Sequence, residues 1–511
     1  MQPRYVLPAV GPADTIDLDF KPKQVAAWLK RLPLSDPLQA AEDLSGYLVT
    51  ANRVKMGYEV RSKMVLQLEP AIEETVTALR NHYAGAPLPL TTRLQPAAHR
   101  AQQLLSELAN AYKILIIDWL NQTFHFSRKP LPRMLQRVLL VLEQVLNISY
   151  ETHENVPRGL WVDLHQTYNY ALRTGLAQTI PEDSATMLSV EQIYKNALLL
   201  ALADPYRFPS TELPWVRDLI ARFGNLAELF PAEEASGHAG IFVIEVNTDE
   251  PPRPLAWVKH PTDPRWDLLL NTTELVKHLA MIATSLRAKQ DPEDMGLPAA
   301  ARDPEYGVML HRLKLSWGAS VQRQAQRRRY QRGKEIEVCL GLRALHQLIG
   351  PVGAERVVAP AGAESAPALL RCQVVDDSMG GVAIRRSGGF AVPVRVGEVV
   401  GLRQGSSGWS VGLVRWFRVP TAGELYFGIQ LLAPKVETVQ VRRGDDGKHY
   451  PGLLLQPAPA LKQSTMLLLP PGSLSPGLEV ELCSQSGPRA VKLDKRLEYT
   501  SSVDVFRLAQ D

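Results

Sequence analysis

The spacing of apolar residues changes near Lys334, and this change constrains the fold more than any other feature of the sequence. Before that point apolar residues recur every three or four positions, whereas after it they form short β-branched and aromatic runs divided by glycines. A helix repeats about every 3.6 residues and a strand every two, so the two parts must fold as different structures. The chain has 511 residues, which is too many for a single core. The sequence therefore predicts an α+β multidomain protein, with helices first and β structure after them.

The first part of the chain predicts a multi-helix bundle over residues 1–235. In the stretch AQQLLSELANAYKILIIDWL, the apolar residues that share one helical face are Leu105, Leu108, Tyr112, Leu115 and Trp119. The stretches PRMLQRVLLVLEQVLNISYE and SVEQIYKNALLLALADPYRF repeat the pattern. Breaks rich in Pro and Gly, such as HYAGAPLPL, separate these segments as loops separate helices.

Residues 236–318 predict a mixed segment. GIFVIEV followed by PLAWVKH has the composition of a short β-hairpin, and two helices are expected after it, near 271–288 and 301–318.

Beyond that segment, the chain predicts antiparallel β structure. The runs LLRCQVVD, GGVAIRR, WSVGLVRWFRV and ELYFGIQLL are short, apolar and divided by glycines, which is typical of a small barrel. We assign this barrel, with the linker before it, to residues 319–435. A further β-rich stretch, from STMLLLPPGSLSPGLEVELCSQ to VDVFRL, predicts a small C-terminal β subdomain over residues 436–511.

Positive charge collects in the second part of the chain. From residue 311 to the end, 27 Lys and Arg stand against 17 Asp and Glu, so 30 of the chain's 57 basic and 36 of its 53 acidic residues precede it. Residues 311–334 hold eight Lys or Arg and no acid, and include the run QRRRYQR. On charge alone this stretch is a solvated linker or a general anion-binding patch.

Two short motifs, one within the basic run and one after it, indicate a more specific binding site. Arg328 and Arg332 form R-x-x-x-R just before the first expected barrel strand. After it, Asp376, Ser378 and Gly381 form D-x-S-x-x-G at an expected turn between strands.

Together, these motifs and the later strand pattern VGLVRWFRVPTAGELYFGIQLL resemble the PilZ domain, a bacterial receptor module for cyclic di-GMP. The resemblance covers roughly residues 325–435, about a fifth of the chain. It implies a PilZ-like antiparallel barrel whose ligand is cyclic di-GMP, with no other cofactor. It also implies a cytoplasmic protein of signal transduction, since members of the family control motility, type IV pili and biofilm formation.

The resemblance assigns ligand contacts to residues whose chemistry suits a guanine dinucleotide. An arginine fork can bond guanine O6 and N7, grip a phosphate or stack on a base. A carboxylate can accept from the guanine N1–H and N2–H₂ edge, a serine fits beneath the base, and a glycine allows positive φ or close backbone approach. The expected ligand-binding residues are Arg328, Arg332, Asp376, Ser378 and Gly381, with Arg327 and Arg329 as auxiliary candidates.

Purely structural roles stay open for part of this set. Gly381 can be an ordinary β-turn glycine, and Asp376 and Ser378 can bond their own backbone in an Asx-type turn. The gap between the two motifs is wider than is usual for the family, and contains HQLIGPVGAERVVAPAGAESAP. Because this insertion is rich in Ala, Gly and Pro, we expect a surface loop.

The sequence does not favour an enzyme or a metal protein. GWSVG, around Ser410, matches the serine hydrolase motif G-x-S-x-G, but it opens a continuous strand instead of a strand–elbow–helix. The histidines lack ligand spacing, and Cys339, Cys372 and Cys483 are far apart, so no metal site and no disulfide framework is expected. No signal peptide or membrane span is evident, and the cytoplasm is the expected compartment.

Three hypotheses about function follow. The favoured one is a cyclic di-GMP receptor in which the ligand orders the arginine linker and reorients the helical domain toward an unidentified protein partner. The second is a non-specific binder of nucleic acid or an anionic surface through residues 311–334. The third is a scaffold protein with a degenerate PilZ-like domain.

Overall fold

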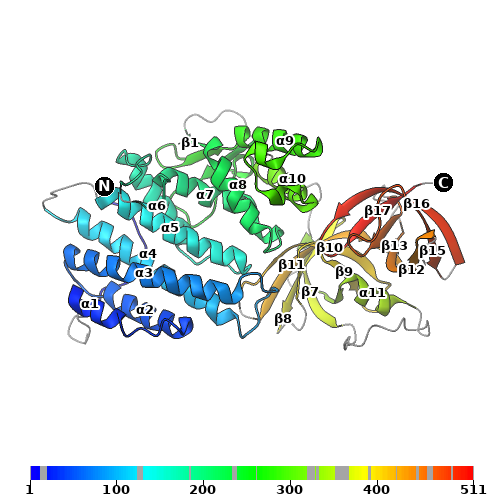
Figure 1. Ribbon diagram of the computed structural model, residues 1–511, viewed down its shortest axis with the longest axis horizontal. Helices are drawn as coiled ribbons and strands as arrows, with labels where there is room; N and C mark the ends of the chain where they lie inside the picture. The colour runs from blue at the N-terminus through cyan, green and yellow to red at the C-terminus, as the bar shows by residue number, and fades with distance from the viewer. Residues whose placement is uncertain are drawn as a thin grey trace. The chain divides into compact units, whose positions relative to one another are not determined.

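The computed structural model describes most of the chain. The described residues are 2–11, 20–123, 130–182, 184, 186–232, 239–260, 262–318, 328–329, 333–350, 368–388, 393–421, 423–444, 448–456, 464–484 and 487–509. They form two compact units, which we call the helical unit and the barrel unit (Figure 1). The helical unit runs to residue 318, except that segments 87–89 and 206–209 group with the barrel unit.

The helical unit is built from long helices with one buried face each. Its helices are α1 (Pro22–Leu29), α2 (Pro37–Asn52), α3 (Tyr58–Tyr83), α4 (Gln95–Leu120), α5 (Pro130–Glu151), α6 (Leu160–Arg173), α7 (Val190–Leu202), α8 (Leu213–Phe223), α9 (Thr273–Arg287) and α10 (Pro304–Gly318). The five apolar residues of α4 that the sequence places on one face, from Leu105 to Trp119, are all buried. The prediction of helices from apolar spacing is confirmed here.

Local sequence explains where several of these helices begin. The Asp36 side chain accepts hydrogen bonds from the first-turn amides of α2, and Pro37 follows it with a preset φ. α7 begins with a capping box, in which Ser189 accepts from the Gln192 amide and the Gln192 side chain accepts from the Ser189 amide. No helix within the described ranges combines the length and apolarity needed to span a bilayer.

A small antiparallel sheet completes the helical unit. Its strands are β1 (Glu228–Pro231), β2 (Ile241–Ile244), β3 (Arg253–Pro254) and β4 (Leu268–Asn271), in the order β1-β4-β2-β3. GIFVIEV contains β2 as expected, but its partner β3 is only Arg253–Pro254, and PLAWVKH continues as a 3-10 helix (Leu255–Trp257) instead of a strand. β4 lies between β1 and β2. The strands β1 and β4, which the sequence analysis did not predict, have 4 residues each, too few for a visible alternation.

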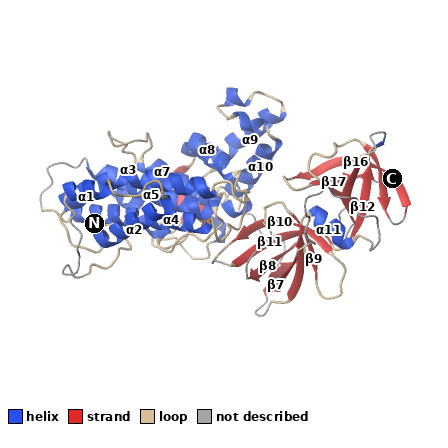
Figure 2. Ribbon diagram, turned by 60° about the horizontal axis from the view of Figure 1, so that its bottom comes forward, coloured by secondary structure: helices blue, strands red, loops and turns tan. Residues whose placement is uncertain are grey.

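The first barrel of the barrel unit closes on itself. Its strands are β6 (Glu335–Leu340), β7 (Leu369–Ser378), β8 (Gly381–Ser387), β9 (Val399–Arg403), β10 (Ser410–Arg418) and β11 (Glu424–Ala433) (Figure 2). They pair in the order β7-β6-β9-β10-β11-β8, and β8 pairs back to β7. The four glycine-divided runs read from the sequence correspond to β7, β8, β10 and β11, so the antiparallel barrel is confirmed.

One helix of this unit contradicts the expected surface loop. The helix α11 (Leu342–Ile349) follows β6, so the first residues of the apparent insertion, from His346, are its last turn. Leu342 and Leu345 of α11 are buried among residues of both barrels. Their apolar side chains explain why this segment packs as a helix, and residues 351–367 lie outside the described chain.

The C-terminal β unit is a second closed barrel, of strands β12 (Val436–Arg442), β13 (His449–Leu455), β14 (Met466–Leu469), β15 (Glu479–Ser484), β16 (Gly487–Tyr499) and β17 (Asp504–Leu508). Part of its apolar interior is its own, but another part is shared with the first barrel. The shared core includes Trp409 and Leu413 of the first barrel with Leu453 and Val505 of the second. The two barrels therefore bury one another's side chains.

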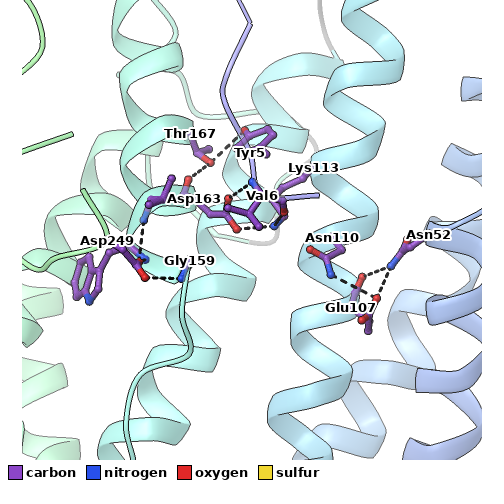
Figure 3. A network of polar contacts seen from close by, with 12 residues as sticks. Tyr5, Val6, Asn52, Glu107, Asn110, Lys113, Gly159, Asp163, Thr167 and Asp249 are labelled. Carbon is purple, nitrogen blue, oxygen red and sulfur yellow. Dashed lines mark hydrogen bonds and ion pairs between the residues drawn. The ribbon is translucent and has the colours of Figure 1, made fainter. Parts of the chain in front are cut away.

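A buried polar network fastens the N-terminal segment to α4 and α6 (Figure 3). Lys113 Nζ donates to Asp163 Oδ2 at 2.5 Å and to the Val6 carbonyl at 2.9 Å. Asp163 Oδ1 accepts from the Val6 amide at 3.2 Å. The carboxylate of Asp249 accepts from the amides at the start of α6, including that of Gly159 at 2.6 Å. Buried charges are tolerated when they are paired and hydrogen-bonded in this way.

His165, two residues after Asp163 on α6, is buried in a neutral state. Its Nε2 lies 2.9 Å from the Glu250 carbonyl, which can only accept, so Nε2 carries the proton. Nδ1 then accepts from the Tyr194 hydroxyl at 2.6 Å. Burial lowers the pKa of His165 to about 4.

This histidine predicts an acid-sensitive helical unit. Because its pKa is lower in the folded chain than in the unfolded one, the unfolded chain binds the proton first as pH falls below about 6.5. The stability that depends on neutral His165 is present above that pH and is lost toward pH 4. Between pH 7 and pH 5 the free energy of unfolding should fall by about 2 kcal/mol through this group. Urea unfolding of the full chain, followed by the helical circular dichroism signal, measures it.

The variant His165→Gln should lose less stability than the wild type over the same pH interval, whatever its stability at pH 7. His99→Gln is the matched control, because the hydrogen bond to Glu154 raises the pKa of His99 and gives it the opposite pH dependence. An equal loss in wild type and His165→Gln would contradict the assignment.

Candidate functional site

The two sequence motifs meet at the C-terminal end of β7. The short strand β5 (Arg328–Arg329) pairs antiparallel with β7, so that Arg328 faces Asp377 and Arg329 faces Asp376. Both arginine side chains are exposed, and the two aspartates are half-buried. Opposite charges directly across an antiparallel pair attract one another, which favours this register. Arg327 and Arg332 lie outside the described residues.

The pairing register divides the two described arginines between the faces of the sheet. Residues directly opposite in an antiparallel pair point to the same face, and neighbours along a strand alternate. Asp376 is opposite Ala383 on β8, whereas Asp377 is opposite Val382, which shares its face with the fully buried Ile384 two residues further along β8. Arg329, expected only as an auxiliary ligand, therefore shares the face of Asp376, and Arg328 lies on the other face.

The D-x-S-x-x-G motif forms the tight hairpin between β7 and β8. Ser378 and Gly381 are directly opposite, and Met379 and Gly380 make the exposed two-residue turn. Ser378 Oγ donates to the Gly381 carbonyl at 3.3 Å. The serine thus stabilises the hairpin itself, and its side chain lies at the turn beside Asp376.

Gly381 is required for space, not for a positive φ. It has no left-handed backbone conformation, but a Cβ added to it would lie 2.6 Å from the Ile429 carbonyl oxygen of β11. The adjacent Gly380 carbonyl accepts from the Leu431 amide at 3.1 Å. The close approach that this glycine permits is to the backbone of β11, and its contact with a ligand stays a prediction.

A row of residues on neighbouring strands crosses the outer face of the barrel from the arginine strand to β10. Read through the strand pairings, the row is Arg329, Asp376, Ala383, Gly428 and Trp416. Four inter-strand steps of about 4.8 Å make this row about 19 Å long, on the order of a flat ligand with two bases. A Cβ on Gly428 would overlap the indole of Trp416, so the ring lies across that glycine. The row joins a cation, a carboxylate and an aromatic plane.

The rows on either side add polar and basic groups. On one side Arg385 of β8 donates to Gln373 Oε1 at 2.8 Å, and a hydrogen bond with Tyr426 raises the pKa of Arg385. On the other side Gln430 lies opposite Gly381 and accepts from Arg415 Nε at 2.7 Å. The outer face therefore suits a ligand with both negative charge and aromatic bases.

Trp416 and Gln430 were not identified from the sequence. Both lie in the runs WSVGLVRWFRV and ELYFGIQLL, whose alternation marks them as outward-facing residues of β10 and β11. A tryptophan that faces outward and lies opposite a glycine could have indicated this site, but that pairing can be recognised only when the register between β10 and β11 is known. A β-bulge in β10 between Val414 and Trp416 hides that register in the sequence.

The remaining candidate chemistry is absent from the described chain. Ser410 begins β10 and its Oγ donates to the Pro434 carbonyl at 3.4 Å, so it occupies no nucleophile elbow. Burial raises the pKa of Cys339 and of Cys372 to about 11, and both are free thiols. Within the described ranges, no three or more His, Cys, Asp or Glu residues come together in a way that could hold a metal ion.

The close approach at Gly381 predicts a strong contrast between two adjacent glycines. Gly381→Ala should destabilise the barrel unit by about 1–3 kcal/mol, because the new methyl group must displace the β11 backbone. Gly380→Ala is the matched control, since a Cβ there meets nothing within 4 Å. Thermal unfolding of both variants measures the contrast, and equal melting temperatures would refute the packing argument.

Comparison with known proteins relates most of the chain to one receptor. Three family models match consecutive parts of the chain: the N-terminal domain of the cyclic-di-GMP receptor FimW at residues 23–233, its middle PilZ domain at 241–352 and 351–437, and its C-terminal β-barrel domain at 436–510. The cyclic-di-GMP receptor FimW of Pseudomonas aeruginosa is 22% identical over 96% of this chain and 90% of its own length. These models describe a receptor and not an enzyme. The middle region of the chain, which carries both motifs and the barrel, thus matches the PilZ domain of this receptor.

Proposed function

We propose that this protein is a cytoplasmic bacterial receptor for cyclic di-GMP, which binds on the outer face of the first barrel. The observation that carries the proposal is the row from Arg329 through Asp376 to Trp416. The named function of the FimW relative supports it.

In this proposal the row recognises the chemistry of the ligand. Asp376 accepts from the N1–H and N2–H₂ groups of a guanine, a donor pattern that adenine lacks. The indole of Trp416 offers a plane on which a base can stack. The arginines of the R-x-x-x-R segment bind the phosphates and the guanine O6 and N7 edge, with Arg328, Arg332 and Arg329 as first candidates and Arg327 after them.

The alternative of a non-specific polyanion binder is less well supported by the contacts of residues 311–334. Arg312, one of the basic residues of that stretch, forms an ion pair of 3.1 Å with the buried carboxylate of Glu212. A cation engaged inside the fold is not free to neutralise phosphates along a nucleic acid. Such a binder would also lose affinity steeply with salt, whereas stacked and hydrogen-bonded guanines would retain much of theirs.

The site predicts selective binding that depends on single residues. Calorimetry of the full chain should show binding of cyclic di-GMP and far weaker binding of cyclic di-AMP and GTP. Arg329→Ala should cost about 2–4 kcal/mol of binding free energy, because a charge-assisted contact is lost and ligand oxygens are left unpaired. Arg328→Ala should also weaken binding, but by less than Arg329→Ala, because Arg328 lies on the other face of β5 and must reach the ligand around the edge of the strand. Asp376→Ala should cost somewhat less.

Arg343→Ala is the matched control, because this exposed arginine lies on α11 and away from the row. Its affinity should equal that of the wild type. Equal affinity of the wild type for the guanine and adenine dinucleotides would contradict the role of Asp376, and a failure of the wild type to bind would leave a scaffold with a degenerate PilZ-like domain.

We further propose that the ligand orders the arginine linker and thereby reorients the helical domain toward a protein partner in motility, pilus or biofilm control. The linker arginines lie between the helical unit and β6, so a ligand that gathers them against the barrel also constrains the connection. A ligand can shift such an equilibrium only by its difference in affinity for the two arrangements.

Hydrogen exchange with and without cyclic di-GMP tests this coupling. We expect protection across residues 318–334 together with changes on helices that precede residue 318. Protection confined to the barrel would show that the ligand only fills a preformed site.

A further inference from the structure

The C-terminal barrel contributes a carboxylate at the edge of the candidate nucleotide face. Glu498, near the end of β16, forms a two-point ion pair with Arg415 of β10: Arg415 Nη2 donates to Glu498 Oε2 at 2.7 Å, and Nη1 donates to Oε1. Both side chains are about three-quarters buried, with 26% and 23% of their surfaces exposed. A bidentate pair that is largely withdrawn from water fixes the direction of the arginine as well as its charge.

Arg415 in turn orients a residue of the candidate nucleotide face, Gln430. A third donor of Arg415, Nε, bonds Gln430 Oε1 at 2.7 Å. Arginine has donors only, so the Gln430 amide must turn its oxygen toward Arg415 and its NH₂ group away from it. Gln430 is exposed and lies directly opposite Gly381, which in turn lies opposite Ser378. The oriented NH₂ group is therefore a donor at the edge of the motif.

Glu498 is itself held firmly by the contacts that follow it in the chain. Thr500 Oγ1 donates to the Gly397 carbonyl at 3.1 Å, and Ser502 Oγ donates to Glu398 Oε2 at 3.1 Å. The shared core of the two barrels lies beside these contacts and includes Val503 and Val505. The carboxylate thus has a fixed position relative to the first barrel.

We propose that Glu498 is a positioning residue for the cyclic di-GMP site, and that the C-terminal barrel is in this way part of the receptor. Glu498 orients Arg415, Arg415 orients Gln430, and the Gln430 amide donates to an acceptor oxygen of the ligand. This inference rests on the proposed function of the first barrel. It gives the C-terminal barrel a role in the affinity for cyclic di-GMP that neither sequence motif predicts.

Glu498→Gln tests the first link. The amide keeps the size of the side chain but removes its charge and one acceptor, so Arg415 and Gln430 must be ordered when the ligand binds. We expect calorimetry on the full chain to show about three- to tenfold weaker binding of cyclic di-GMP, the cost of ordering one or two long side chains. Gln430→Ala should give a loss of the same size.

Asp494→Asn is the matched control. Asp494 lies on the same strand and accepts from Arg507 Nε at 2.7 Å, but this ion pair joins β16 to β17 within the C-terminal barrel. Its removal should change affinity by less than about twofold, since exposed pairs contribute little. Equal losses in Asp494→Asn and Glu498→Gln would overturn the inference.

Two combined variants separate positioning from a structural role. In Glu498→Gln with Gln430→Ala, the losses should not add, because both changes break one chain of contacts. In Arg415→Glu with Glu498→Arg, the ion pair between the barrels is restored in reverse, so the melting temperature should recover while the affinity stays low. Additive losses, or full recovery of affinity in the reversed pair, would overturn the inference.

A wild-type chain that does not bind cyclic di-GMP would refute the proposed function and this inference with it. Normal binding by the wild type together with unchanged affinity of Glu498→Gln would refute this inference alone.

Discussion

The candidate nucleotide face of the first barrel depends on the close approach of β8 to β11. That approach is possible because Gly381 has no side chain to collide with the Ile429 carbonyl. Along the next row, Ala383 is opposite Gly428, and the indole of Trp416 lies across that glycine. The aromatic plane is thereby held against the strands, with the carboxylate and the arginine at the other end of the row. A larger side chain at Gly381 or Gly428 would collide with the β11 backbone or with the indole and disturb this arrangement.

The sequence predicted those parts of the fold in which one segment is sufficient to define a pattern. Five buried residues of α4 follow from helical spacing alone, and four barrel strands follow from alternation between glycines. The helix α11 was missed because its eight residues come directly after a strand and merge with an insertion rich in Ala and Gly. A short helix has no room for repeated turns, and its apolar residues find their partners in two different barrels.

The candidate site was predictable in its composition but not in its geometry. Motif spacing identified Asp376, Ser378 and Gly381, which do meet at one hairpin. It could not show that Arg329, and not Arg328, lies on the face of Asp376, because that depends on the register between β5 and β7. Moving a strand by one residue exchanges its two faces without altering its sequence. Contacts such as that of Arg415 with Glu498 are still less visible, since they join residues 83 positions apart.

The core shared by the two barrels also determines how the barrel unit responds to a bound molecule. Leu413 and Leu432 lie in the same buried cluster as Leu453 and Leu468, so neither barrel can unfold without exposing apolar surface of the other. Such elements open together as one cooperative unit. A ligand that binds only the folded first barrel then lowers the population of the opened state of both. Protease resistance at a distant strand of the C-terminal barrel would thus rise by mass action alone, without any change of shape carried from one barrel to the other.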